Sequence, residues 1–167
     1  MGFSLVIAGS RTVHPSVTEV DAAVMLLPWD RLGLPAPRDA EEINRSITLV
    51  VDGGAPGGDH AGRLWAETRA IQVRDEPITE EDIRRWGKYL GPRMRNRRMA
   101  EIGDAAVVFW DGKSNGSTDF VARMVLRRKH VEIVPTKMAA KRPTRRYPSA
   151  NPSLPDGHSW SCAPDSP

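Results

Sequence analysis

At 167 residues, the chain is long enough for one domain built around a single hydrophobic core, and no apolar run of about 18 residues predicts a membrane-spanning helix. The formal net charge is +3, but five of the 24 basic residues lie within residues 137–146, where no acid occurs. Residues 147–167 add two acids and no base, so residues 1–136 hold 19 bases and 19 acids. A domain with no net charge is not typical of proteins that bind nucleic acid through a basic surface.

Short apolar runs alternate with helical spacings of apolar residues along most of the chain. The apolar runs predict five strands, at residues 4–8, 47–51, 70–73, 105–110 and 131–134. Helical spacing predicts helices that follow Pro15, follow Asp59, begin at Pro92 and cover residues 116–129. This alternation is typical of an α/β domain, in which a parallel sheet lies between two layers of helices.

The connections between these elements carry their own signals. Pro28 is expected to end the first helix, and residues 28–40 contain three prolines, which indicates an irregular surface excursion. Thr79 is suited to cap the N-terminus of a helix, because Glu80, Glu81 and Asp82 follow it. On the helix after Asp59, one face carries Ala61, Leu64, Trp65 and Thr68. We expect Leu64, Met99 and Val125 to pack in the core.

Residues 137–167 are expected to form a basic junction and a disordered tail attached to the domain of residues 1–136. Six of the 14 prolines lie between residues 143 and 167, and aliphatic residues are almost absent there. The one cysteine, Cys162, has no partner for an internal disulfide, and with His158 it supplies too few ligands for a zinc site. With no apolar signal segment before the first strand, we expect a cytoplasmic protein without a bound metal.

Three glycine-rich turns each follow a predicted strand, at residues 9–11, 53–59 and 111–117. Strands of a parallel sheet end at one edge, so we expect the three turns to share a crevice there. Backbone N–H groups in such turns, together with the positive end of a helix dipole, favour an anion, and the phosphate of a nucleotide is the default ligand.

Side chains near the turns extend this prediction. Hydroxyls of serine and threonine can donate to a ligand, arginine can meet phosphate oxygens, and aspartate can accept from a ribose or a base. The candidate ligand-binding residues are Gly9, Ser10, Arg11, Gly53, Gly54, Gly57, Asp59, Arg95, Asp111, Gly112, Ser114, Gly116, Ser117 and Thr118. None of the turns matches GxxxxGK[ST] or GxGxxG, so the marks of ATP hydrolysis and of dinucleotide redox chemistry are missing, and no cofactor is expected.

Five motifs occur in an order that resembles one known family. They are Val6-Ile7-Ala8-Gly9-Ser10-Arg11, Gly53-Gly54-Ala55-x-Gly57-x-Asp59, Trp86-Gly87-Lys88, Gly91-Pro92-x-x-Arg95-Asn96-x-x-Met99 and Asp111-Gly112-Lys113-Ser114-x-Gly116-Ser117. Over residues 4–135 the chain resembles the SLOG superfamily, in its YspA-like, cpYpsA-related branch. The resemblance implies a Rossmann-like fold, adds Asn96 to the candidate ligand-binding residues, and implies a nucleotide-derived ligand such as an ADP-ribose-like molecule. It also implies a sensor in a conflict system of bacteria or phages.

More distant relatives in this superfamily are LOG-type phosphoribohydrolases, which release the base of a nucleoside monophosphate and are commonly dimers. Their arginine and methionine match Arg95 and Met99, but their catalytic glutamate falls at Phe120, with Asp119 one residue early. A shift of one residue turns a helical side chain by about 100 degrees, which follows from the 3.6 residues per turn. The resemblance therefore implies Arg95 and Asp119 as catalytic candidates and a homodimer as the assembly.

Three functions follow as hypotheses. The first is a binding module that senses or sequesters a nucleotide-like ligand in the crevice. The second is a phosphoribohydrolase that uses Arg95 with Asp119 or with another carboxylate such as Asp59. The third is an interaction with nucleic acid or protein through residues 137–146 and the tail, although a basic run of this kind is more typical of a solubilising junction.

Overall fold

The computed structural model describes residues 2–136, and the basic run and tail predicted for residues 137–167 lie outside that range. One parallel sheet of five strands forms the centre of the molecule, in the order β3-β2-β1-β4-β5. The strands are β1 (Phe3–Gly9), β2 (Ile47–Asp52), β3 (Gln72–Asp75), β4 (Ala105–Trp110) and β5 (His130–Pro135). The predicted α/β class and the parallel sheet are confirmed, and the fold is Rossmann-like.

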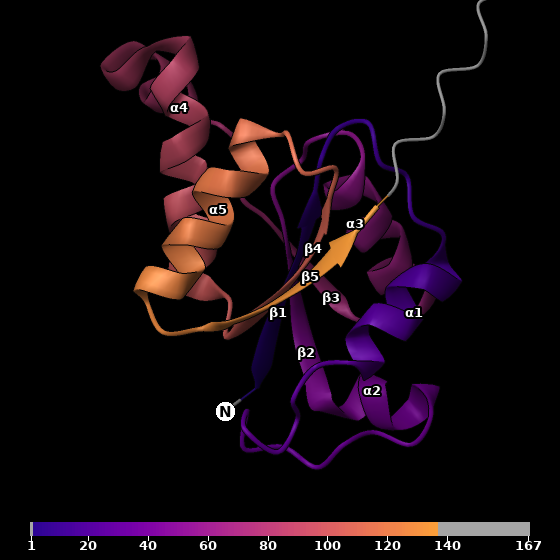
Figure 1. Ribbon diagram of the computed structural model, residues 1–167. Helices are drawn as coiled ribbons and strands as arrows, with labels where there is room; N and C mark the ends of the chain where they lie inside the picture. Colours follow the sequence, from indigo (N-terminus) through magenta and orange to yellow (C-terminus); the bar gives the residue numbers. More distant parts are fainter. Residues whose placement is uncertain (1, 137–167) are drawn as a thin grey trace, which may run out of the picture.

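Helices cover both faces of this sheet (Figure 1). Residues 2–136 form five helices: α1 (Val17–Met25), α2 (Ala40–Ser46), α3 (Gly58–Thr68), α4 (Glu80–Ile102) and α5 (Asn115–Leu126). On one face, Leu5 and Ile7 of β1 pack with residues of α1, α2 and α3 in the larger core. On the other face, Val6 and Ala8 pack with Met99 of α4 and with residues of α5. The alternation of side chains along a strand thus divides the core into two layers.

The structure corrects the predicted helices at two places. Residues 40–46, for which no helix was predicted, form α2, whose first turn is capped by Asp39 as it accepts a hydrogen bond from the N–H of Glu42 at 2.9 Å. Helix α4 begins at Glu80 after the predicted cap Thr79, rather than at Pro92. Gly87 interrupts α4 with a φ of 72°, so the helix consists of two segments, and Pro92 lies in the early part of the second.

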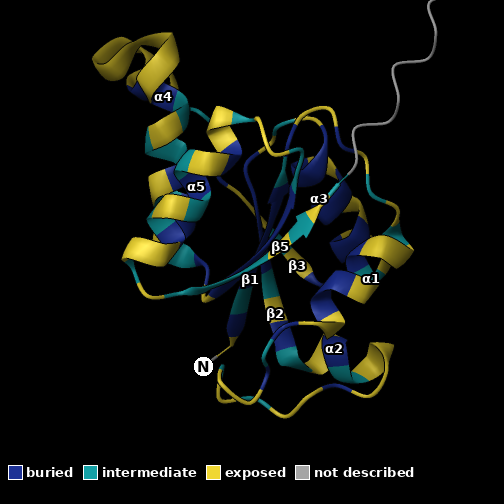
Figure 2. Ribbon diagram, viewed as in Figure 1, coloured by how far each residue is buried: buried dark blue, intermediate teal, exposed yellow. Residues whose placement is uncertain are grey.

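Smaller differences concern single residues. Strand β3 begins at Gln72 because Ala70, in the expected strand, has a φ of 53° and belongs to the turn after α3. Leu64 and Val125 are 47% and 60% exposed, so the prediction that they pack in the core is wrong, whereas Met99 is buried as expected. Figure 2 shows exposed residues concentrated along the N-terminal segment of α4, which extends beyond the sheet.

Two glycines allow β1 and α3 to meet with no side chain between them. A Cβ atom at Gly58 would lie 2.5 Å from the Cα and the N of Gly9, and Gly57 has a φ of 89°. The first and second glycine-rich turns are therefore in direct backbone contact. The order of strands reverses between β1 and β4, which is the position where open α/β sheets leave a crevice at their carboxyl edge.

Between residues 2 and 136, no helix combines the length and apolar character that a membrane crossing requires.

Candidate functional site

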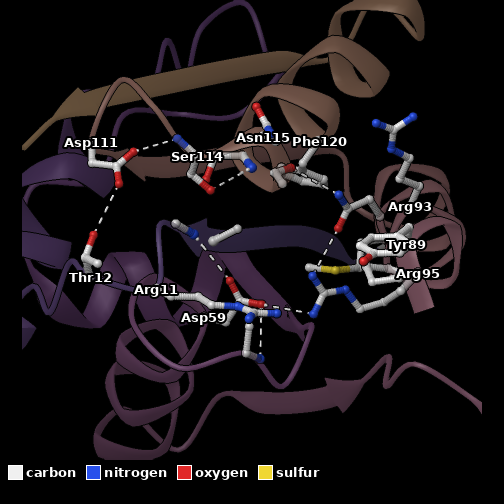
Figure 3. A pocket seen from close by; sticks show the side chains of 18 of the residues that line it. Arg11, Thr12, Asp59, Tyr89, Arg93, Arg95, Asp111, Ser114, Asn115 and Phe120 are labelled. Atoms are coloured by element: carbon white, nitrogen blue, oxygen red, sulfur yellow. Dashed lines mark hydrogen bonds and ion pairs between the residues drawn. The ribbon is translucent and has the colours of Figure 1, made fainter.

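A cavity of about 530 Å³ opens at the carboxyl edge of the sheet, beside β1 and β4 and between α4 and α5 (Figure 3). All three glycine-rich turns reach its wall, and α4 supplies the facing wall. The lining consists of Ala8, Gly9, Arg11, Thr12, Ala55, Asp59, Lys88, Tyr89, Pro92, Arg93, Arg95, Asn96, Met99, Asp111, Ser114, Asn115, Gly116, Ser117 and Phe120. Its volume lies within the range of about 300–1,000 Å³ that small-molecule sites occupy.

Most of the candidate ligand-binding residues lie in this lining. Those that do are Gly9, Arg11, Asp59, Arg95, Asn96, Asp111, Ser114, Gly116 and Ser117. Gly54 and Gly57 line a second hollow of about 480 Å³, together with His14 and His60, on the other side of the second turn. The structure places the remaining candidates outside both linings: Ser10, Gly53, Gly112, Thr118 and Asp119.

Asp111 holds the third turn in shape and ties it to the first. Its carboxylate accepts hydrogen bonds from the N–H groups of Lys113 and Ser114, at 2.9 and 2.8 Å, and from the hydroxyl of Thr12 at 3.2 Å. The N–H of Asp111 in turn donates to the hydroxyl of Ser10 at 3.1 Å. These bonds lower the pKa of Asp111 to about 2, with the N–H groups of Lys113 and Ser114 as the largest cause. Asp111 is therefore an ionised, structural acceptor at neutral pH.

Asp59 is the buried carboxylate of the cavity. It lies in the first turn of α3, is 3% exposed, and accepts hydrogen bonds from the N–H groups of Gly9 and Ala55, at 3.3 and 3.4 Å. The guanidinium of Arg95 lies 3.6 Å from its carboxylate. Burial raises the pKa of Asp59 to about 6, because the loss of hydration outweighs the attraction of Arg95. The group thus joins two turns and titrates close to neutral pH.

Arg95 and Asn96 connect α4 to the second and third turns. Arg95 donates from Nη1 to the carbonyl oxygen of Gly53 at 2.6 Å and from Nη2 to the side-chain oxygen of Asn96 at 3.2 Å. The side-chain amide of Asn96 donates to the carbonyl oxygen of Gly116 at 3.1 Å and to Asp119 at 3.0 Å. Much of the hydrogen-bonding capacity of Arg95 is therefore used inside the protein, although its Nε is buried without a partner in the described residues.

The resemblance to phosphoribohydrolases singles out Asp119 and Phe120, and only Phe120 lines the cavity. The carboxylate of Asp119 accepts two hydrogen bonds from Arg123, at 2.9 and 3.1 Å, as well as the one from Asn96. Phe120, which occupies the place of the catalytic glutamate, is 3% exposed and lines the cavity. At the position that the resemblance aligns with a catalytic glutamate, the helix therefore presents an aromatic ring to the cavity, and the carboxylate of the neighbouring Asp119 is paired with Arg123.

The mouth of the cavity carries positive charge that sequence reasoning only partly found. Arg11, Lys88 and Arg93 are exposed, and none of them forms an ion pair within residues 2–136. Lys88 and Tyr89 come from the second segment of α4, where the ammonium of Lys88 lies 5.2 Å from the centre of the Tyr89 ring. Tyr89 is 80% exposed. The motif Trp86-Gly87-Lys88 was the only signal in the sequence for this part of the wall.

Comparison with known proteins supports the fold. No protein-family model matches the sequence, and no curated protein matches it either. Among solved structures, the chain is similar to DNA processing protein A (DprA) from Streptococcus pneumoniae, with a TM-score of 0.52 at 16% sequence identity. The match covers 84% of this chain and 52% of that one, so this chain spans about half the length of DprA. At this level of identity, the similarity shows a shared fold.

Proposed function

We propose that the protein binds a nucleotide or a nucleotide-derived ligand in the cavity beside β1 and β4, and that it senses or sequesters this ligand as a YspA-like member of the SLOG superfamily. The observation that carries the proposal is the meeting of three glycine-rich turns and two helix N-termini on one cavity. The first turns of both α3 and α5 contribute to its lining, through Asp59 and through residues 115–117.

The N-terminus of α5 is the better anion site of the two. Asn115 and Gly116 are its first residues, both are exposed, and the amides of a first helical turn have no partner inside the helix. Ser114 caps this helix as its hydroxyl accepts from the N–H of Ser117. At the N-terminus of α3, the buried carboxylate of Asp59 occupies the corresponding place. A ligand anion is therefore expected near α5.

Binding to a nucleotide panel tests the proposal. A ligand at 100 times its Kd adds about 2.7 kcal/mol to the free energy of unfolding, which corresponds to a rise of roughly 10 °C in Tm for a domain of this size. We expect such a rise with at least one nucleotide in a thermal-shift measurement.

Gly116→Leu tests whether the ligand occupies the cavity, because the larger side chain would fill part of it. A Cβ atom at Gly116 would have Ser114 Oγ at 3.9 Å as its nearest neighbour, so the side chain enters open space without disturbing the backbone. Val125→Leu is the control, because Val125 is 60% exposed on the same helix and lies outside the lining. We expect the first variant to lose the ligand-dependent rise in Tm and the second to keep it. A panel without any rise, or an unchanged rise in Gly116→Leu, would refute the proposal.

A phosphoribohydrolase is the second candidate, and the observation that favours it is Asp59. A buried carboxylate with a pKa of about 6 is suited to exchange a proton with a leaving base near neutral pH. Incubation with nucleoside monophosphates, followed by chromatography of the free base, separates the two functions. The binding proposal expects no release. Release that disappears in Asp59→Asn would replace it with the enzyme.

A further inference from the structure

We propose that the protein docks on the surface of an anionic membrane through the tip of α4, which consists of residues 83–90. The contact is peripheral: side chains enter the boundary between lipid and water, and no helix crosses the bilayer. This inference does not depend on the proposed nucleotide site. It rests on the shape of the tip, on its exposed apolar side chains and on the charge around it.

The tip is a protruding bend in the helix. A Cβ atom added to Gly91 would lie 3.1 Å from Cδ1 of Ile83 and 3.4 Å from the carbonyl oxygen of Asp82. In a straight helix, eight residues span about 12 Å, so these contacts require a sharp bend, which the φ of 72° at Gly87 provides. All eight residues of the tip are exposed, and Figure 1 shows this end of α4 projecting beyond the sheet.

Exposed apolar side chains are concentrated in the tip. Within residues 2–136, ten large apolar side chains are exposed, and four of them lie in these eight residues. They are Ile83, Trp86, Tyr89 and Leu90, with exposed fractions between 41% and 80%. Tryptophan and tyrosine are enriched where lipid meets water, and the aliphatic side chains beside them can enter the acyl boundary. The tip therefore has the side chains of a shallow membrane anchor.

The region around the tip carries a net positive charge. Residues 80–93 contain four bases and three acids. One of these acids, Asp82, pairs with Arg98 at 2.8 Å, so the region together with Arg98 has a net charge of +2. The other two acids, Glu80 and Glu81, precede the tip. Bases held near an anionic leaflet add to the attraction, so an anionic surface is favoured over a zwitterionic one.

The pairing of cations with aromatic rings favours lipid over two other partners. The guanidinium of Arg85 lies 5.2 Å from the centre of the Trp86 ring, and the ammonium of Lys88 lies 5.2 Å from that of Tyr89. At a membrane surface, the cations reach the lipid phosphates while the rings lie below them. A stacking nucleic-acid base would compete with these cations and would leave the aliphatic side chains without a partner. A contact with a second copy or another protein would bury Lys88, and lysine is depleted in such interfaces.

Cosedimentation of the full chain with phospholipid vesicles, in the absence of nucleotide, tests the inference. We expect vesicles with about 40% phosphatidylglycerol to bind at least tenfold more protein than vesicles of phosphatidylcholine alone, and added salt to weaken the binding. Trp86→Ala should weaken binding at least tenfold, and Tyr89→Ser severalfold. Because Tyr89 is 80% exposed, the second variant changes the tip without disturbing the core. Leu126→Ala is the control that should bind like the wild type, because Leu126 is equally exposed but lies at the end of α5.

Tryptophan fluorescence locates the contact. The chain has five tryptophans, so the signal of Trp86 is the difference between the wild type and Trp86→Phe. We expect vesicles to shift this signal to shorter wavelength, while Trp86→Phe still binds because it keeps an aromatic ring.

Two outcomes would overturn the inference. Vesicle binding that is unchanged in both Trp86→Ala and Tyr89→Ser would assign it to another surface, such as the basic run of residues 137–146. The absence of binding to anionic vesicles would do the same, including the case in which the tip instead binds a single-stranded oligonucleotide or a second copy. Either result would leave the proposed nucleotide site in place.

Discussion

Replacing the buried carboxylate by an amide, in Asp59→Asn, is expected to stabilise the unliganded protein at neutral pH. Burial raises the pKa of Asp59 from its ordinary value of 3.8 to about 6 in the folded protein. A difference of about two units between the folded and unfolded states corresponds to about 3 kcal/mol of unfolding free energy. Asn cannot ionise, and its side-chain oxygen can still accept from the N–H of Gly9 or of Ala55.

The sign of the pH dependence follows from which state holds the proton more tightly. Between pH 4 and pH 6 the folded protein keeps the proton of Asp59 while the unfolded chain releases it. The contribution of Asp59 to stability is therefore fully present below pH 4 and is lost as the pH rises through 6. Asp111 and Asp82 act in the opposite sense, because their pKa values are lowered and their contributions are lost only as the pH falls below about 4.

Urea unfolding of the wild-type protein and of Asp59→Asn, at half-unit steps from pH 4 to pH 8, measures this contribution. The other titrating groups are common to both proteins and cancel in the difference between the two unfolding free energies. We expect the variant to gain on the wild type by up to about 3 kcal/mol as the pH rises from 4 to 7. Two parallel curves would show that the pKa of Asp59 is the same in the folded and the unfolded protein, and the argument from burial would be refuted.

Three further predictions concern the walls of the cavity. Gly58→Ala places a Cβ atom 2.5 Å from the backbone of Gly9, so we expect a loss of about 2–3 kcal/mol in urea unfolding, and a loss below 1 kcal/mol would contradict the close approach. Arg98→Ala removes the ion pair at 2.8 Å that anchors Asp82, so amide hydrogen exchange in the N-terminal segment of α4 should accelerate, and unchanged exchange would show that the segment is held by other contacts. Phe120→Glu adds a negative charge to the lining of the cavity and should weaken nucleotide binding at least tenfold in a titration, whereas full affinity would place the ligand elsewhere.

The sheet and the three turns could be predicted because their signals are local. Uncharged runs such as residues 105–110 have few alternatives to a buried parallel strand. Three of the runs, at residues 4–8, 47–51 and 105–110, lead directly into glycine-rich sequence. The meeting of the turns then follows from the parallel arrangement alone. Charge balance and glycine spacing carried no information on the wall formed by α4, because its position depends on packing between helices that are far apart in the sequence.

The predictions that the structure corrects also depend on packing between elements that are far apart in the sequence. Leu64 and Val125 fit a helical apolar pattern, yet each lies at the edge of its buried stripe, and tertiary packing decides on which side of that edge a residue falls. The sequence predicts that Pro92 opens a helix, but α4 already begins at Glu80, and the break within it falls at Gly87 rather than at the proline. The polar network of Asp59, Arg95, Asn96 and Asp119 joins three separate elements, so no spacing within the chain could predict it.

The backbone contact between β1 and α3 has a consequence for how this cavity can adapt to different ligands. With Gly9 and Gly58 touching, the first and second turns form one fixed wall that cannot widen without separating the strand from the helix. The second segment of α4 approaches the sheet through Met99 and Ala100, while Lys88 and Tyr89 extend beyond it after the break at Gly87. Changes in the size of the accepted ligand must therefore be accommodated by α4, and related sequences with other ligands should differ most between residues 88 and 93.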